Sequence, residues 1–384
     1  MKEFFKKHLG SDSVIWIVFA LLCVISVIEM YSAATKLVTS AVAEGTSYNT
    51  PIFKQLIILF GGIVGIILLH YIPFKIIRFG GYVMLLASVV LLLITLASGS
   101  STNGASRWLF GFQPSELAKL SVIIVVADLI SRIRDNAAEQ KRYFWGIMLV
   151  TVAVCGLIFP ENFSTAALLF GVVFLMMFVG QISWKYLAGT LGAIAVFLVI
   201  VFAVVKVLPD EKMQDGILHR ADTWINRVEN HGDNATQIND DNRQVVHAKI
   251  AIAQGNSNLI VGAGPGNSEQ RYYLSNASSD FVFAIIVEEM GLLGGIFVIA
   301  LYLVLLYRAG RVATKSKTVF PSVIVIGLTL MIVIQAFTHM AVATNLGPVT
   351  GQPLPLISHG GTSVIMTCIY IGIILSATRQ IRNE

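Results

Sequence analysis

The chain passes from a polar loop into a membrane helix within the stretch NASSDFVFAIIVEEMG, residues 276–291. Asp280 ends the polar part, and the apolar run behind it carries two adjacent glutamates, Glu288 and Glu289. Carboxylates at the mouth or inside of a membrane helix are costly to keep and usually mark a functional site. Asp280 is therefore a candidate base that faces an aqueous site at the outer membrane surface. The alternative is a helix cap, because aspartate is a favoured N-cap residue.

The composition excludes an ordinary soluble domain. Of 384 residues, 55% are hydrophobic and only 13% are charged, and the mean hydropathy is +0.76; a soluble domain carries about 25% charged residues. The three cysteines lie in apolar runs without metal or redox spacing, so we interpret them as packing residues. The predicted fold class is all-α, a polytopic membrane protein with a single membrane domain over residues 1–384.

Hydropathy predicts about ten transmembrane helices, since a span needs about 20 mostly apolar residues. The fourth and fifth are the shortest and least secure. The predicted spans are 14–35, 54–73, 79–98, 115–131, 145–159, 164–182, 186–207, 281–307, 320–342 and 361–378.

The basic residues orient these spans. With the N-terminus inside, sixteen lysines and arginines fall in inner segments, and four lie in or beside short outer loops (Lys36, Lys54, Arg107 and Lys119). Short inner loops of membrane proteins are enriched in basic residues. Both termini are therefore predicted to be cytoplasmic, and the long polar segment of about residues 208–279, between the seventh and eighth spans, to be extracytoplasmic.

This long loop contains three recognisable parts. Residues 229–242 are typical of a flexible segment, residues 244–254 have the spacing of a short amphipathic helix, and residues 262–266 (GAGPG) predict a tight turn. The turn lacks the strand before it and the Gly-Lys-Ser/Thr after it that a phosphate-binding loop requires. We therefore do not expect a nucleotide site.

A second outer cluster precedes the fourth span. Gln113, Pro114 and Ser115 predict a helix start, with Glu116 in the first turn. Glu116 and Lys119 are three residues apart and can pair on one face. The pair is either structural or part of a site. Arg107, in the loop before it, suits a phosphate or sugar ligand, with a solvated loop arginine as the alternative.

Three further features remain open. In Pro160-Glu161-Asn162, Asn162 is interpreted as a cap of the sixth span. The three prolines and four glycines of residues 345–361 exclude a regular helix, so this backbone must line protein or water. His359 within it can titrate near neutrality, although a lone histidine is more often a structural hydrogen-bonding group. Glu29, inside the first span, needs a partner or neutralisation.

The two glutamates after Asp280 differ in their expected roles. On a straight helix, Glu288 lies about 12 Å deeper than Asp280 and about 80° around the axis, and Glu289 lies roughly opposite. Glu288 is thus the candidate to line the same cavity as Asp280. Glu289 is expected to serve helix packing.

Together, these motifs resemble the SEDS family (shape, elongation, division and sporulation) of ten-span membrane proteins, which includes the FtsW, RodA and SpoVE groups. The likeness rests on three spaced signatures: Asn103-Gly104-Ala105 and Arg107-Trp108 followed by residues 113–119 (QPSELAK), Asp280-Phe281 with Glu288-Glu289 and Gly291, and Gly351 with residues 353–355 (PLP), Ser358 and Gly360-Gly361. The chain is more similar to the division-type (FtsW-like) members than to the elongation-type (RodA-like) ones.

The resemblance implies a peptidoglycan glycosyltransferase that polymerises lipid II outside the cytoplasmic (inner) membrane, at the division site. It implies a class B penicillin-binding transpeptidase and other divisome proteins as partners. The family's essential aspartate falls on Asp280, and its conserved glutamate and lysine fall on Glu116 and Lys119. Three departures weaken the transfer elsewhere: Glu161 replaces the usual aspartate of the short outer turn, His359 replaces a tyrosine, and a ninth-span asparagine is replaced around Thr338-His339.

The expected chemistry is inverting transfer of a lipid-linked sugar, with Asp280 as general base. Cations such as Arg107, Lys119 and Arg220 can hold the pyrophosphate leaving group. A divalent cation (Mg or Mn) can assist there, but no ligand cluster identifies one. The expected substrate-binding residues are Arg107, Trp108, Gln113, Glu116, Lys119, Arg220, Glu288, Ser358 and His359. The alternatives are a lipid II flippase, since polar residues in a multi-span bundle suit a transporter, and a non-catalytic scaffold for a transpeptidase.

Overall fold

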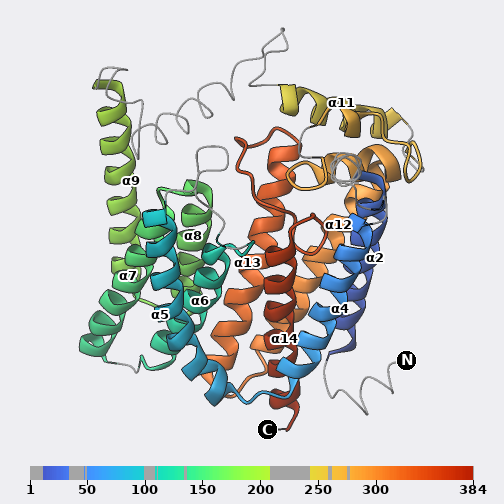
Figure 1. The fold of residues 1–384 in the computed structure, drawn as a ribbon. Coiled ribbons are helices and arrows are strands. Elements are labelled where there is room, and N and C mark those ends of the chain that lie inside the picture. Colours follow the sequence, from blue (N-terminus) through green and yellow to red (C-terminus); the bar gives the residue numbers. More distant parts are fainter. Residues whose placement is uncertain are drawn as a thin grey trace. The chain divides into compact units, whose positions relative to one another are not determined.

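The structure is a computed structural model that describes residues 12–33, 47, 50–98, 109, 111–133, 136–207, 243–257, 262–274 and 277–383. These residues form helices (Figure 1). Their bounds are α2 Ser13–Ala33, α4 Thr50–His70, α5 Phe74–Ser98, α6 Pro114–Ser131, α7 Ala137–Ile158, α8 Phe163–Val179, α9 Trp184–Val207, α11 Arg243–Ser257, the 3₁₀ helix η3 Gln270–Tyr272, α12 Val282–Ala313, α13 Val319–Ala343 and α14 Gly361–Asn383. The predicted all-α class is confirmed.

The ten predicted spans each correspond to a helix of the described part. Eight are long and apolar enough to cross a membrane by themselves. The other two are α6, which carries Glu116, Lys119 and Asp128 in 18 residues, and α8, which has 17 residues. The fifth span, expected to be short, is the 22-residue α7. The two spans that are too short or too polar to qualify by themselves are thus the fourth and the sixth, where the fourth and the fifth were expected.

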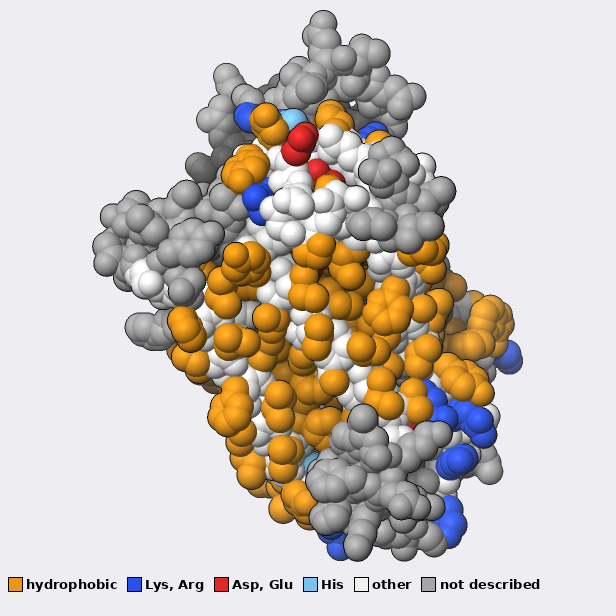
Figure 2. Space-filling model, turned by 90° about the vertical axis from the view of Figure 1, so that its right-hand side faces the viewer, with side chains coloured by type: hydrophobic (Ala, Val, Ile, Leu, Met, Phe, Trp, Pro, Cys, Tyr) orange, Lys and Arg blue, Asp and Glu red, His pale blue; other side chains and the backbone are white. Residues whose placement is uncertain are grey.

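The exterior of the helices fits a lipid environment. Figure 2 shows hydrophobic side chains covering the middle of one face, with charged side chains gathered beyond this band. On α4, for example, Phe53, Ile57 and Phe60 are all exposed. Such a broad exposed apolar band is typical of a membrane-spanning surface.

The chain divides into two compact units, Met1–Ile77 with Ala235–Glu384, and Arg78–Asn234. In the first, α4 packs along α14, and α12 packs against α11, α13 and α2. Gly62 of α4 lies so close to Cys368 of α14 that a Cβ atom there would come within 2.5 Å of its sulfur. Cys368 is therefore a packing residue, as predicted. The single membrane domain remains a prediction.

In the second unit, α6 packs against α7 and α8. Asp128 of α6 is buried and forms ion pairs with Arg78 at 3.1 Å and Arg132 at 2.7 Å. Tyr82 adds a hydroxyl hydrogen bond to the same carboxylate at 2.6 Å. These contacts join the start of α5 to the end of α6.

The two ends of the described chain meet in the first unit. The amide of Asp12 donates to the Thr378 hydroxyl at 3.2 Å, and the Asp12 carboxylate pairs with Arg308. The start of α2 and the end of α14 therefore lie on the same side. This agrees with an even number of spans and with both termini in one compartment.

Helix α12 is broken at Gly291, which has φ 70° and ψ 179°. Positive φ is accessible to glycine at little cost. Residues 292–313 alone make about 33 Å of helix, enough to cross a hydrocarbon core of about 30 Å. The part before the break, which begins at Val282, is therefore not needed to span the membrane, and it lies against α11 (Figure 1).

Candidate active site

Asp280 lies in a turn over residues 277–280, immediately before α12. It is half-buried, whereas the residues that follow it are buried. The N-cap of α12 is Phe281, and no side-chain hydrogen bond caps the helix there. Asp280 thus precedes the N-cap position by one residue.

The proline- and glycine-rich loop between α13 and α14 holds this turn. The amide of His359 donates to the carbonyl of Ser278 at 2.8 Å. The Ser358 hydroxyl donates to the carbonyl of Ser279 at 2.6 Å and accepts from the amide of Leu354 at 2.7 Å. Two residues expected at the site, Ser358 and His359, thus fix the backbone that leads directly to Asp280.

The same loop is anchored on its other side by buried side chains. Tyr302 of α12 donates its hydroxyl to the carbonyl of Pro355 at 2.6 Å. Gln335 of α13 donates to the carbonyl of Pro353 at 2.9 Å. From Leu354 to Ser358 the irregular backbone is buried in protein. This agrees with the prediction that it lines protein or water, because irregular backbone at membrane depth must be shielded from lipid.

His339 of α13 is a part of this arrangement that sequence reasoning missed. Its Nδ1 lies 2.9 Å from the carbonyl of Gln352, and its Nε2 accepts from the amide of Phe283 at 3.5 Å. A proton on Nδ1 satisfies both contacts. The imidazole thus links the loop to the first turn of α12, three residues after Asp280. A polar residue in an apolar span was the available signal.

We expect His339→Leu to lower the polymerising activity that the family resemblance implies by about tenfold or more. The change leaves the amide of Phe283 and the carbonyl of Gln352 buried without this partner, at about 1–3 kcal/mol each, and a small displacement of a reacting group is costly. The measurement is kcat and KM for a lipid-linked disaccharide substrate, and the loss is expected in kcat. His339→Gln keeps a donor and an acceptor and is the matched control. Equal kcat in the leucine and wild-type proteins would contradict this role.

The imidazole ring and the main chain of His359 have different surroundings. Burial, followed by the positive charge of Lys54, lowers the pKa of His359 below its usual value of 6.5. Its Nδ1 is buried and has no hydrogen-bond partner among the described residues. Burial and Lys54 thus both favour the neutral imidazole, and the main chain of His359 makes the structural contact.

Glu288 and Glu289 both bind the outer loop, which corrects the division of roles expected from a straight helix. Glu288 accepts from the Ser268 hydroxyl and from the amides of Glu269 at 2.9 Å and Gln270 at 3.3 Å. Its carboxylate thus holds the loop. The sequence had predicted that Glu288 lines the same cavity as Asp280. Helix geometry could not predict these contacts, because their donors come from a loop that precedes the helix in the sequence.

Glu289, the next residue of α12, binds the same loop and also contacts α2. It accepts from the amides of Gly266 at 3.0 Å and Ser268 at 3.2 Å, and from the hydroxyl of Ser32 on α2.

The predicted tight turn is present, and Gly262 packs so closely on the α12 backbone that a Cβ atom would come within 2.5 Å of the Gly291 nitrogen. The predicted amphipathic helix of the loop corresponds to α11.

In the second unit, α6 begins as predicted. Gln113 is the N-cap residue, Pro114 opens the helix, and the Gln113 amide donates to the Ser115 hydroxyl at 3.1 Å. The predicted Glu116–Lys119 pair forms at 2.7 Å, and both side chains are buried. Burial of both members makes this pair far more sensitive to the loss of one partner than a surface pair would be.

Other sequence predictions meet different outcomes. Asn162 caps α8 by accepting from the amide of Thr165 at 3.2 Å, as predicted. Glu29 is buried, and neither of its oxygens has a hydrogen-bond partner among the described residues.

Some predicted features lie outside the described residues, namely Arg107, Trp108, Arg220 and the segment predicted to be flexible. Within the described part, no three His, Cys, Asp or Glu residues form a group that could hold a metal ion.

Comparison with known proteins relates this arrangement to one family. The profile of a family described as "Cell cycle protein" (FtsW, RodA, SpoVE) matches residues 12–383. A protein of Halomonas elongata named "Probable peptidoglycan glycosyltransferase FtsW" is 30% identical over 96% of this chain and 92% of its own length. A Bacillus subtilis protein of the same name is 28% identical over 98% of this chain and 93% of its own length.

Solved structures show the same fold. One, described as "Structural coordination of polymerization and crosslinking by a peptidoglycan synthase complex", superposes with a TM-score of 0.76 at 22% identity and covers 97% of this chain and 99% of its own. Another is the rod shape determining protein RodA of Thermus thermophilus, with a TM-score of 0.67 at 22% identity, covering 97% of this chain and 98% of its own. The fold is therefore shared along nearly the whole chain.

Proposed function

The chain belongs to the FtsW/RodA/SpoVE family of cell cycle proteins, and from this premise we propose that it is a peptidoglycan glycosyltransferase. Its substrate is lipid II, which it polymerises into undecaprenyl-linked glycan at the outer face of the bacterial cytoplasmic membrane. The relatives named FtsW favour a role in septal wall synthesis over an elongation-type role. A class B penicillin-binding transpeptidase and other divisome proteins are the proposed partners, at the division site.

The observation that carries this proposal is the fixed position of Asp280. The turn before α12 is held by Ser358 and by the main chain of His359, so the half-buried carboxyl of Asp280 sits on an ordered backbone at the polar end of a membrane helix. A general base needs such a position, because proton transfer requires hydrogen-bond reach to the attacking group.

In the proposed reaction, Asp280 accepts the proton of the acceptor sugar hydroxyl as its oxygen attacks the anomeric carbon of the donor. The new glycosidic bond forms while the bond from that carbon to the pyrophosphate breaks, and undecaprenyl pyrophosphate leaves. Attack opposite the leaving group inverts the anomeric centre. The proton then passes from Asp280 to water. Arg107, Lys119 and Arg220 are the proposed cations for the leaving pyrophosphate.

Polymerisation of labelled lipid II by the purified full chain together with its transpeptidase tests this function. Long glycan, seen on a denaturing gel and degraded by a muramidase, is the expected product. The alternative from another class is a lipid II flippase. It would give no polymer with pure protein and substrate, and would instead speed translocation of lipid II in liposomes, which would overturn the proposal.

A further inference from the structure

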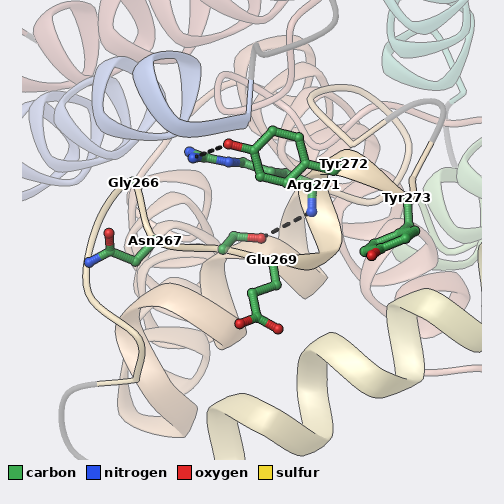
Figure 3. A pocket seen from close by; sticks show the side chains of 7 residues that line it. Gly266, Asn267, Glu269, Arg271, Tyr272 and Tyr273 are labelled. Carbon is green, nitrogen blue, oxygen red and sulfur yellow. Dashed lines mark hydrogen bonds between the residues drawn. The ribbon is translucent and has the colours of Figure 1, made fainter.

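A pocket of about 580 Å³ lies on the outer loop, apart from the turn that carries Asp280. It is lined by residues 266–269 and 271–273 (Figure 3). Most of its lining side chains are polar or aromatic, and Tyr272 and Tyr273 are 58% and 52% exposed. Ligand pockets usually have volumes of about 300–1,000 Å³, so this pocket is large enough for one or two sugar rings.

The backbone of the pocket is held rigidly from below. Glu288 and Glu289, on the first part of α12, together accept hydrogen bonds from four backbone amides of the loop, those of Gly266, Ser268, Glu269 and Gln270. Both carboxylates are buried. Fixing a loop in its binding conformation lowers the entropy lost when a ligand binds. The two glutamates thus preorganise the surface that lies above them.

Tyr273 provides a fixed aromatic wall. Its ring stacks on the ring of His247 from α11, with centroids 5.0 Å apart and planes at 7°. His247 is itself held, because its Nδ1 lies 2.9 Å from the side-chain oxygen of Gln270. Tyr273 therefore has one face supported by His247 and is half exposed to the pocket. An exposed, supported aromatic face is suited to the apolar C–H face of a sugar ring.

The charges of the pocket disfavour an anionic ligand. The guanidinium of Arg271 is engaged, donating to the carbonyl of Ser32 at 3.2 Å and to the Tyr272 hydroxyl at 2.9 Å. The carboxylate of Glu269 is exposed and points into open space in Figure 3. Asn267 is exposed as well, and its amide nitrogen donates to the carbonyl of Ala263. An uncommitted carboxylate beside an engaged cation suits hydroxyl and amide groups better than pyrophosphate.

We propose that this pocket is a subsite for the growing glycan strand, distinct from the position where the sugars react. The proposal rests on the proposed function and adds a second binding site for the glycan strand. Tyr273 stacks on a sugar ring of the strand, and Glu269 accepts hydrogen bonds from its hydroxyl or acetamido groups. The pocket floor lies about 10 Å along α12 from the helix start that follows Asp280, which is within reach of a strand still attached at the reacting centre.

Binding of uncrosslinked glycan oligosaccharides to the purified full chain tests the subsite. We expect Tyr273→Ala to weaken this binding about tenfold and Tyr273→Phe, which keeps the ring, to change it less than twofold, in keeping with the free energy of one aromatic contact. Glu269→Ala is expected to weaken it about fivefold, in keeping with the net free energy of one solvent-exposed hydrogen bond. At equal consumption of lipid II, the Tyr273→Ala protein should also give shorter strands.

The outcomes of these measurements separate this proposal from its rivals. Equal oligosaccharide affinity in the wild-type and Tyr273→Ala proteins would overturn the subsite, even if wild-type polymerisation stands. If Glu269→Gln instead strengthens binding of inorganic pyrophosphate at this pocket, the ligand is the lipid pyrophosphate and the glycan subsite is wrong. If Tyr273→Ala weakens only the complex with the transpeptidase, the surface is a protein interface, which also overturns it. Absence of polymer with the wild type would count against the proposed function alone.

Discussion

Replacing Asp280 by asparagine is expected to lower the rate of lipid II polymerisation by about 10²–10⁴-fold, the usual contribution of a positioned general base. Asparagine has nearly the same size and shape but cannot accept the proton of the acceptor hydroxyl. The turn around it is fixed by hydrogen bonds from Ser358 and from the main chain of His359 to backbone carbonyls. The substitution is therefore expected to preserve the structure of the turn and to remove the group that accepts the proton.

Binding distinguishes this result from a folding defect. The Asp280→Asn protein should retain its affinity for lipid II within about twofold and its thermal stability in detergent, because Ser358 and the main chain of His359 still hold the backbone of the turn. Asp280→Glu is the matched control: it keeps the carboxylate but moves it by one methylene, so an intermediate rate is expected. Wild-type rates in the asparagine variant would exclude Asp280 as the base, and normal septation in cells carrying it would favour the scaffold alternative.

Lys119→Met is expected to destabilise the protein by about 3–5 kcal/mol, because it leaves the buried carboxylate of Glu116 without its ion partner. The two side chains are 0% and 5% exposed and lie 2.7 Å apart. The double variant Lys119→Met/Glu116→Gln removes both charges. It should recover most of the lost stability, measured as the midpoint of unfolding in detergent for the full chain.

The polymerisation rate of the double variant then tests whether Lys119 contacts the substrate. We expect it to remain low although stability returns, since Lys119 is one of the proposed cations for the pyrophosphate. Recovery of both properties would restrict the pair to a structural role, the alternative that the sequence left open. A single variant as stable as the wild type would contradict the buried ion pair itself.

Local sequence patterns predicted the helices well. Within lipid, helices satisfy all backbone hydrogen bonds internally, so hydropathy alone locates the spans. The start of α6 at Pro114 and the pair three residues apart on its first turns also follow from local geometry. The cap of α8 at Asn162 is a local hydrogen bond of the same kind.

The arrangement around Asp280 required contacts between distant parts of the chain. Ser358 holds the carbonyl of Ser279 from 79 residues away, and His339 reaches Phe283 from 56 residues away. No periodicity encodes such partners. For the same reason the sequence could not decide that Phe281, one position beyond Asp280, is the N-cap of α12.

The stretch 276–291 illustrates both sides of this division. The sequence by itself determined that a polar loop ends at Asp280 and that an apolar helix carrying Glu288 and Glu289 follows, because composition and period are local properties. Only the tertiary structure decided what these carboxylates do. Glu288 and Glu289 face a loop that folds back from residues 263–270 and donates its amides to them, whereas Asp280 stays in the turn above the helix. The physical reason is that a buried carboxylate takes the donors that the fold brings to it.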